Sequence, residues 1–132
     1  MLHGRCLCET VQYELRGDPI AMYYCHCAQC RRATGSSFAT NLLVRSDDLH
    51  VVAGEAAMAR YESSPGKFRH FCARCGSPIF SRSDSMPQIS SLRAGTLDED
   101  PGLRPATHIW VSAKAPWLEI QDELAQRPEG LT

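Results

Sequence analysis

The chain has 132 residues, of which 43% are hydrophobic, and its 14 Lys and Arg side chains face 15 Asp and Glu. This length predicts one domain that buries a core without crosslinks, and the balanced charge argues against a general binder of nucleic acids or membrane surfaces. No apolar run approaches the ~18 residues of a membrane helix, and the N-terminus lacks a signal-peptide pattern. We therefore expect a cytoplasmic protein with neither a nucleic-acid nor a membrane partner.

Short strands dominate the predicted secondary structure. In TVQYELR, residues 10–16, Val11, Tyr13 and Leu15 alternate with polar residues, which is the period of a half-buried strand. The further predicted strands are residues 21–24, 37–45, 49–54, 57–63, 67–71, 79–83, 88–95 and 107–112. One helical turn is expected in CAQCRRAT, residues 27–34, with Gly35 at its end.

The C-terminal part of the chain has weaker signals. Residues 98–105 are predicted as a loop, residues 115–120 as a strand or a turn, and the polar tail from Asp122 as frayed. Taken together, the segments predict a mainly β protein of several short antiparallel strands.

All seven cysteines fall into three short groups, and reductants in the cytoplasm would keep them as thiols. The groups are C-x-C at Cys6 and Cys8, C-x-C-x-x-C at Cys25, Cys27 and Cys30, and C-x-x-C at Cys72 and Cys75. Zinc binds thiolates in a tetrahedron with sulfur atoms roughly 3.8 Å apart, which residues two or three apart on a tight turn can provide. Gly76, directly after the last cysteine, favours such a turn because glycine readily adopts a positive φ. The pattern predicts metal ligands.

Seven ligands divide most naturally into four and three, because a closed structural zinc site needs four and a catalytic site keeps an open position. The four-cysteine cluster would consist of Cys6, Cys8, Cys72 and Cys75. The triplet would consist of Cys25, Cys27 and Cys30. Spacing alone leaves two alternatives: Cys72 and Cys75 share a metal with two members of the triplet, or a histidine or acidic residue closes the triplet site.

An open site with three thiolates would favour a particular chemistry. Zn²⁺ held by three thiolates carries one net negative charge, which makes it a poor Lewis acid but a good partner for a soft ligand such as a substrate thiol. The coordinated thiol would be deprotonated and could attack a small aldehyde such as formaldehyde.

Other residues near the triplet are weaker candidates. Arg31 could offset the thiolate charge or hold a substrate carboxylate, although Arg31 and Arg32 could also be a solvated pair at a helix end. His26 lies between two predicted ligands, so we expect its side chain to face away, in a packing role or as a proton shuttle. His108 is expected either to line the site or to lie in the core, and Trp117 to be partly exposed.

Five sequence blocks resemble the glutathione-dependent formaldehyde-activating enzyme family, which includes centromere protein V. The blocks are GRCLC, CHCAQCRRATGSSF, FCARCGSPIF, AGTLD and HIWVSAKAPWLEI, and the resemblance covers about residues 4–122. It implies a zinc-bound fold of the β-tent type in a single domain, residues 1–132, with a polar tail at 123–132. Glu9 departs from the family, which often has glycine after the first C-x-C.

The same resemblance implies two zinc ions per chain, a structural one on the four-cysteine cluster and a catalytic one on the triplet. The implied activity is the condensation of glutathione with formaldehyde to S-(hydroxymethyl)glutathione, a carbon–sulfur lyase reaction run backwards. The alternatives are a non-catalytic, zinc-stabilised binding module, and a protein that captures electrophiles without turnover. The oligomeric state stays open.

Overall fold

The computed structural model describes residues 1–131, and these residues are mainly β, as predicted. The strands are β1 (Leu2–Arg5), β2 (Gln12–Leu15), β3 (Ala21–Cys25), β4 (Ala39–Arg45), β5 (Leu49–Ala53), β6 (Met58–Ser64), β7 (Lys67–Cys72), β8 (Pro78–Ser83), β9 (Ile89–Arg93), β10 (Thr107–Ile109) and β11 (Ala125–Gln126). The helix is α1 (Ala28–Thr34), and short 3₁₀ turns lie at Ser46–Asp48, Glu55–Ala57, Ala94–Thr96 and Val111–Ala113.

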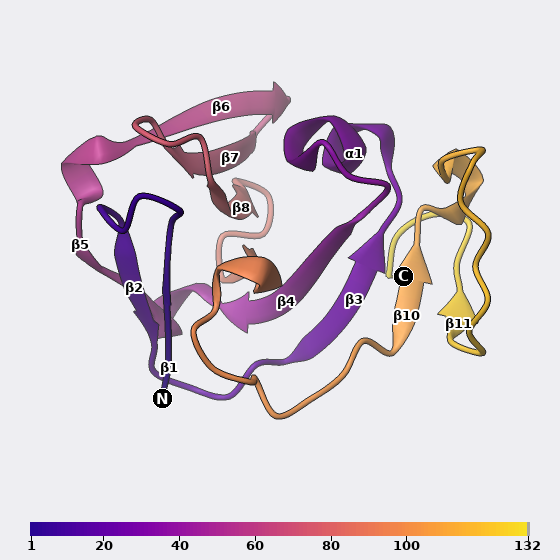
Figure 1. The fold of residues 1–132 in the computed structure, drawn as a ribbon, viewed down its shortest axis with the longest axis horizontal. Coiled ribbons are helices and arrows are strands. Elements are labelled where there is room, and N and C mark those ends of the chain that lie inside the picture. The colour runs from indigo at the N-terminus through magenta and orange to yellow at the C-terminus, as the bar shows by residue number, and fades with distance from the viewer. Residues whose placement is uncertain (132) are drawn as a thin grey trace.

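The strands form two sheets. A three-stranded antiparallel sheet has the order β1-β2-β5, and an eight-stranded sheet has the order β11-β10-β3-β4-β9-β8-β7-β6. Pairing in the large sheet is antiparallel except where β10 runs parallel to both β3 and β11. Figure 1 shows the small sheet at one side of the molecule and β10 and β11 at the other, with α1 beside the ends of β3 and β4.

The predicted alternation around β2 places its apolar side in the core. Val11, Tyr13 and Leu15 are at most 1% exposed, and they belong to a cluster that also contains Leu42 and Leu92 of the large sheet. A second, smaller apolar cluster consists of Tyr23, Cys25, Cys30, Ala39 and Ile109. Two members of the triplet are therefore anchored in a core of their own.

The helix α1 confirms the predicted helical turn and its end at Gly35. Gly35 adopts a left-handed φ of 65°, and its amide donates to the Arg31 carbonyl, which is the usual glycine C-cap. With only seven residues, α1 is far too short for a membrane span. Within residues 1–131, no helix is long and apolar enough to cross a membrane.

The C-terminal segment differs from its prediction. The predicted strand at 107–112 ends at Ile109, because Trp110 takes a left-handed φ of 57° and starts a 3₁₀ turn. The prediction of a frayed tail is wrong: Ala125–Gln126 pairs with β10, the Arg127 amide donates to the His108 carbonyl at 2.8 Å, and the Trp110 amide donates to the Glu129 carbonyl at 2.7 Å. These hydrogen bonds join backbone groups only, so the polar side chains of this segment did not predict them.

Candidate metal centres

The four-cysteine cluster is assembled from two loops that lie far apart in the sequence. Cys6 and Cys8 lie between β1 and β2, Cys72 ends β7, and Cys75 lies before β8. All four sulfurs lie within 4.8 Å of one another. The Cys6–Cys8 and Cys8–Cys72 sulfur distances are 3.6 and 3.8 Å, close to the roughly 3.8 Å of a tetrahedral thiolate site. The donor set and its spacing fit zinc.

Two tight turns shape this cluster. Gly76 has φ 81°, and its amide donates to the Cys72 carbonyl at 2.7 Å, as expected for a turn after C-x-x-C. Glu9 has φ 66°, and its amide donates to the Cys6 carbonyl at 3.0 Å. Glu9 therefore adopts the left-handed conformation that a glycine would adopt without steric cost, so the departure from the family pattern leaves the turn intact.

Hydrogen bonds at Cys8 and Cys75 favour the thiolate, which is the form that binds metal. The Ser77 hydroxyl lies 3.3 Å from the Cys75 sulfur and, together with the Ser77 amide, lowers the pKa of Cys75 to about 5. The Thr10 hydroxyl, 3.2 Å from the Cys8 sulfur, lowers the pKa of Cys8. Burial raises the pKa of Cys6, and the Val11 amide opposes that shift.

The triplet lies on one continuous segment. Cys25 ends β3, Cys27 is the N-cap of α1, and Cys30 lies in its first turns. Their sulfurs also lie within 4.8 Å of one another, with Cys25 and Cys30 buried and Cys27 half-buried. Among residues 1–131, no histidine, carboxylate or further cysteine joins this group. The three thiols fit a metal site with one position free.

Hydrogen bonds within the triplet shift the pKa values of Cys25 and Cys30 in opposite directions. Bonds from Cys25 and Cys27 lower the pKa of Cys30, while the neighbouring thiols of Cys27 and Cys30 raise the pKa of Cys25. The Cys30 amide also donates to the Cys27 sulfur at 3.2 Å, so the N-cap of α1 is itself a sulfur atom. The helix start and the thiol geometry thus depend on the same residue.

Two buried arginines, which the sequence analysis did not single out, face the triplet. Arg69 of β7 and Arg93 of β9 are only 9% and 6% exposed, and their positive charges further lower the pKa of Cys30. The Arg69 Nη1 lies 3.9 Å from the Cys30 sulfur. Neither guanidinium forms an ion pair with a carboxylate of residues 1–131. Because a buried charge needs a counter-charge, the thiolates of the triplet are the natural partner.

Neutral groups hold these guanidiniums in place. Arg69 donates to the Ser63 hydroxyl at 3.0 Å and to the Gln29 side-chain oxygen at 3.1 Å, so it links β6, β7 and α1. Arg93 donates to the Asn41 side-chain oxygen, while its Nε is buried without a partner in the described chain. A cavity of about 190 Å³ is bordered by both arginines and by Ala33 of α1.

The remaining candidates are placed differently. Arg31 forms no side-chain hydrogen bond or ion pair with residues 1–131, and its Nε is buried without a partner, so a role in charge offset stays a prediction. Arg32 is exposed. The Trp117 side chain is 71% exposed, in agreement with its prediction, and its indole donates to the Ser37 hydroxyl at 3.0 Å.

His26 and His108 are buried and form a chain of hydrogen bonds that ends at the exposed Asp122. The His26 Nε2 lies 2.8 Å from the His108 Nδ1, and the His108 Nε2 lies 2.9 Å from an Asp122 carboxylate oxygen. Burial lowers the pKa of His26, and the bond from His108 lowers the pKa of Asp122. The His26 side chain points to His108, as expected for a residue between two ligands. Asp122 was missed because it lies in the segment predicted to fray.

The chain is similar to known proteins over most of its length. The family model described as "Glutathione-dependent formaldehyde-activating enzyme" matches residues 1–113. A Halomonas elongata protein named "Putative glutathione-dependent formaldehyde-activating enzyme" is 31% identical over 136 aligned residues, covering 96% of this chain and 85% of the relative. The crystal structure of a Rhodobacter sphaeroides protein superposes with a TM-score of 0.63 at 25% identity, covering 78% of this chain and 91% of that one.

The match of the family model extends over more than half of the chain and includes every cysteine of both clusters. The Halomonas relative is similar over nearly the whole sequence. This chain therefore belongs to the glutathione-dependent formaldehyde-activating enzyme family.

Proposed function

We propose that the protein is a zinc-dependent, carbon–sulfur lyase-type enzyme that joins glutathione to formaldehyde. The observation that carries the proposal is the triplet: three thiols with no fourth protein ligand in the described chain, facing two buried arginines. Family membership supports the same substrates. We further propose that the whole chain acts as one cytoplasmic zinc domain.

The triplet thiols would hold the catalytic zinc, and the four-cysteine cluster would hold a structural one. With zinc bound, the triplet would offer a free coordination position that favours a thiol in its thiolate form. In the reaction, a bond forms between the glutathione sulfur and the formaldehyde carbon. The carbonyl π bond breaks, and the proton lost by the thiol is balanced by one gained at the new hydroxyl oxygen.

The chain's own residues would contribute charge and position. Arg69 and Arg93 would offset the excess negative charge of a three-thiolate site, which is costly to bury without counter-ions. Arg93 borders the cavity beside α1, so its guanidinium would be the group that meets an anionic part of the substrate. Glutathione carries carboxylates, and a guanidinium binds these well.

A screen of thiols against small aldehydes on the zinc-loaded protein tests the proposal. We expect turnover to be highest with glutathione and formaldehyde, and Cys27→Ser to abolish it while the circular dichroism stays native. The serine hydroxyl can still cap α1 but cannot replace the thiolate. In the matched variant Cys72→Ser, we expect the fold itself to be lost.

Spectroscopy separates binding from turnover. With cobalt in the triplet, added glutathione should change the thiolate charge-transfer bands if its sulfur enters the free position. A spectrum that stays unchanged at millimolar glutathione, together with no turnover in the screen, would instead support a zinc-stabilised binding module. A changed spectrum without turnover would support capture of electrophiles.

A further inference from the structure

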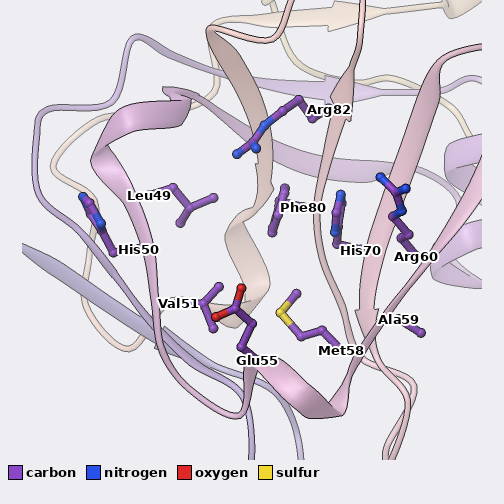
Figure 2. A pocket seen from close by; sticks show the side chains of 10 residues that line it. All are labelled: Leu49, His50, Val51, Glu55, Met58, Ala59, Arg60, His70, Phe80 and Arg82. Atoms are coloured by element: carbon purple, nitrogen blue, oxygen red, sulfur yellow. The ribbon is translucent and has the colours of Figure 1, made fainter.

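A second, larger pocket lies away from the triplet. It has a volume of about 620 Å³, within the usual range for small-molecule sites, and it is lined by β5 and the strands β6, β7 and β8 (Figure 2). We name it the arginine–aromatic pocket after four residues that line it, Arg60, Arg82, His70 and Phe80.

Strand register places this pocket on the face of the sheet opposite the triplet. Arg60 pairs with His70, and His70 pairs with Phe80, so these three residues form one row across β6, β7 and β8. Successive side chains of a strand point to opposite faces, and Arg69, next to His70, reaches the triplet. The side chains of the arginine–aromatic pocket thus point away from the triplet, while His70 and Phe80 also border the cavity beside α1.

The floor of the pocket is aromatic and its sides are partly apolar. The rings of His70 and Phe80 are stacked, with centroids 4.3 Å apart and planes inclined by 11°. Leu49, Val51 and Met58 add apolar surface around them (Figure 2). A planar ring could pack against this stack and displace water from it.

Two cations border this aromatic floor without an acidic partner. The Arg60 guanidinium lies 4.2 Å from the centroid of Phe68, and the Arg82 guanidinium lies 5.2 Å from the centroid of Phe80. Arg82 also donates to the Ser90 hydroxyl at 2.8 Å. Neither arginine forms an ion pair within residues 1–131. Their free donors can therefore bind a ligand without breaking an ion pair.

The local charge contrasts with that of the whole chain. The pocket is bordered by two arginines, two histidines and a single acidic residue, Glu55, whereas the chain as a whole has a net charge of −1. The pocket is complementary to an anion, and guanidinium groups match carboxylates best.

We propose that the arginine–aromatic pocket binds a small planar anion of the aromatic carboxylate class. The ring of the ligand would pack on the His70–Phe80 stack, and its carboxylate would accept hydrogen bonds from Arg60 and Arg82. No covalent step is involved.

The test uses 1-naphthoate as probe on the zinc-loaded full chain, titrated by calorimetry and by NMR. We expect one equivalent to bind with a Kd below about 1 mM. The neutral analogue 1-naphthamide and the ringless anion acetate should each bind at least about tenfold more weakly. Shift changes should centre on His70 and Phe80.

Variants that remove arginine charges test whether Arg60 and Arg82 bind the carboxylate. Arg60→Gln/Arg82→Gln should weaken 1-naphthoate binding by about tenfold or more. The matched variant Arg16→Gln/Arg104→Gln removes two charges outside the pocket and should leave binding unchanged. The single variant Arg60→Gln changes an exposed side chain, so we expect it to fold normally. Its affinity for 1-naphthoate should lie between those of the wild type and the double variant.

Several results would overturn the proposal. These are unchanged affinity in both pocket variants, equal binding of 1-naphthamide, or shift changes confined to the triplet. Concentration-dependent dimerisation that disappears in the Arg60→Gln/Arg82→Gln variant would show that the pocket is a contact between copies instead. None of these readouts uses turnover, so failure here leaves the proposed reaction untouched.

Discussion

At the scale of single residues, the backbone around each cluster cysteine brings the sulfurs together. Cys27 combines two roles, since it caps α1 and contributes a sulfur to the triplet. Gly76 and Glu9 turn the chain next to the four-cysteine cluster with positive φ. Positions of this kind are sensitive to the residue type because only a few side chains tolerate the conformation.

Glu9 provides a test of backbone strain. A non-glycine residue in the left-handed region costs about 1 kcal/mol relative to glycine, so Glu9→Gly should relieve that cost. The substitution also removes the exposed ion pair between Glu9 and Arg5, so Glu9→Ala is the matched control that loses the pair without relieving the strain. In urea unfolding of the zinc-loaded protein, we expect the glycine variant to be about 1 kcal/mol more stable than the alanine variant. Equal stability would contradict the strain.

Arg69 provides a test of charge compensation. Replacing it by glutamine keeps polar contacts to neighbouring groups but removes the positive charge beside Cys30. Groups that support metal ligands typically contribute 10- to 100-fold in affinity, so we expect Arg69→Gln to weaken zinc binding at the triplet by about tenfold or more. Competition with a chromophoric chelator measures the change. Arg104→Gln, which changes an exposed arginine paired with Asp100, should have no effect.

Tyr13 provides a test of pH dependence. Burial raises the pKa of Tyr13 to about 12 from its ordinary value of 10, against a hydrogen bond with Thr96. The folded state therefore disfavours the tyrosinate, and the stability linked to Tyr13 is fully present below pH 10 and is lost as the pH rises towards 12. The free energy of unfolding should fall by about 2 kcal/mol more in the wild type than in Tyr13→Phe between these pH values. Parallel curves for the two proteins would contradict this.

At the scale of elements, the strands that the sequence predicted well are those with an apolar alternation. β2 has this pattern, and its inward side chains are buried. β1 was missed because its sequence LHGR has no apolar alternation, and β11 because it has only two residues, both exposed. These two strands are stabilised mainly by backbone hydrogen bonds to a neighbouring strand, and such pairing cannot be predicted from a single sequence.

The C-terminal segment tests this explanation. A chain that ends at Gln121 loses β11, the Asp122 contact to His108 and the bonds to the amides of Trp110 and Val111. At about 0.5–1.5 kcal/mol per hydrogen bond, we expect the truncation to lower the stability by about 2–4 kcal/mol. Hydrogen exchange at Trp110 and Val111 should accelerate.

A chain that ends at Gly130 is the control, because it retains all of these bonds. If both truncated chains unfold at the same urea concentration, the segment contributes nothing to stability. Such a result would support the frayed tail that the sequence suggested.

At the scale of the whole molecule, the two cysteine clusters have different structural consequences. The four-cysteine cluster joins the loop after β1 in the small sheet to the end of β7 in the large sheet (Figure 1). The triplet draws its three sulfurs from a single segment whose neighbours already pack in a core. A metal in the first cluster would therefore connect the sheets, whereas a metal in the second would not.

Metal removal distinguishes these roles. With increasing chelator, we expect one zinc ion to leave first, from the triplet, with little change in far-UV circular dichroism. Loss of the second ion should unfold the chain, since binding free energy at a structural site is folding free energy. Metal content and circular dichroism followed in the same titration provide the measurement, and Cys27→Ser should lack only the first step. Simultaneous loss of both ions would contradict an open site.

The sequence by itself determined the family, the mainly β class and the local groups of cysteines, because each depends on residue type and short spacing. Comparison with known proteins confirmed the family. Only the tertiary structure decided which groups face one another across long stretches of chain. Arg69 and Arg93 approach the triplet, and Asp122 reaches His108, through strand pairings between segments distant in sequence. Such contacts arise from the packing of the whole chain, and no local pattern of residues encodes them.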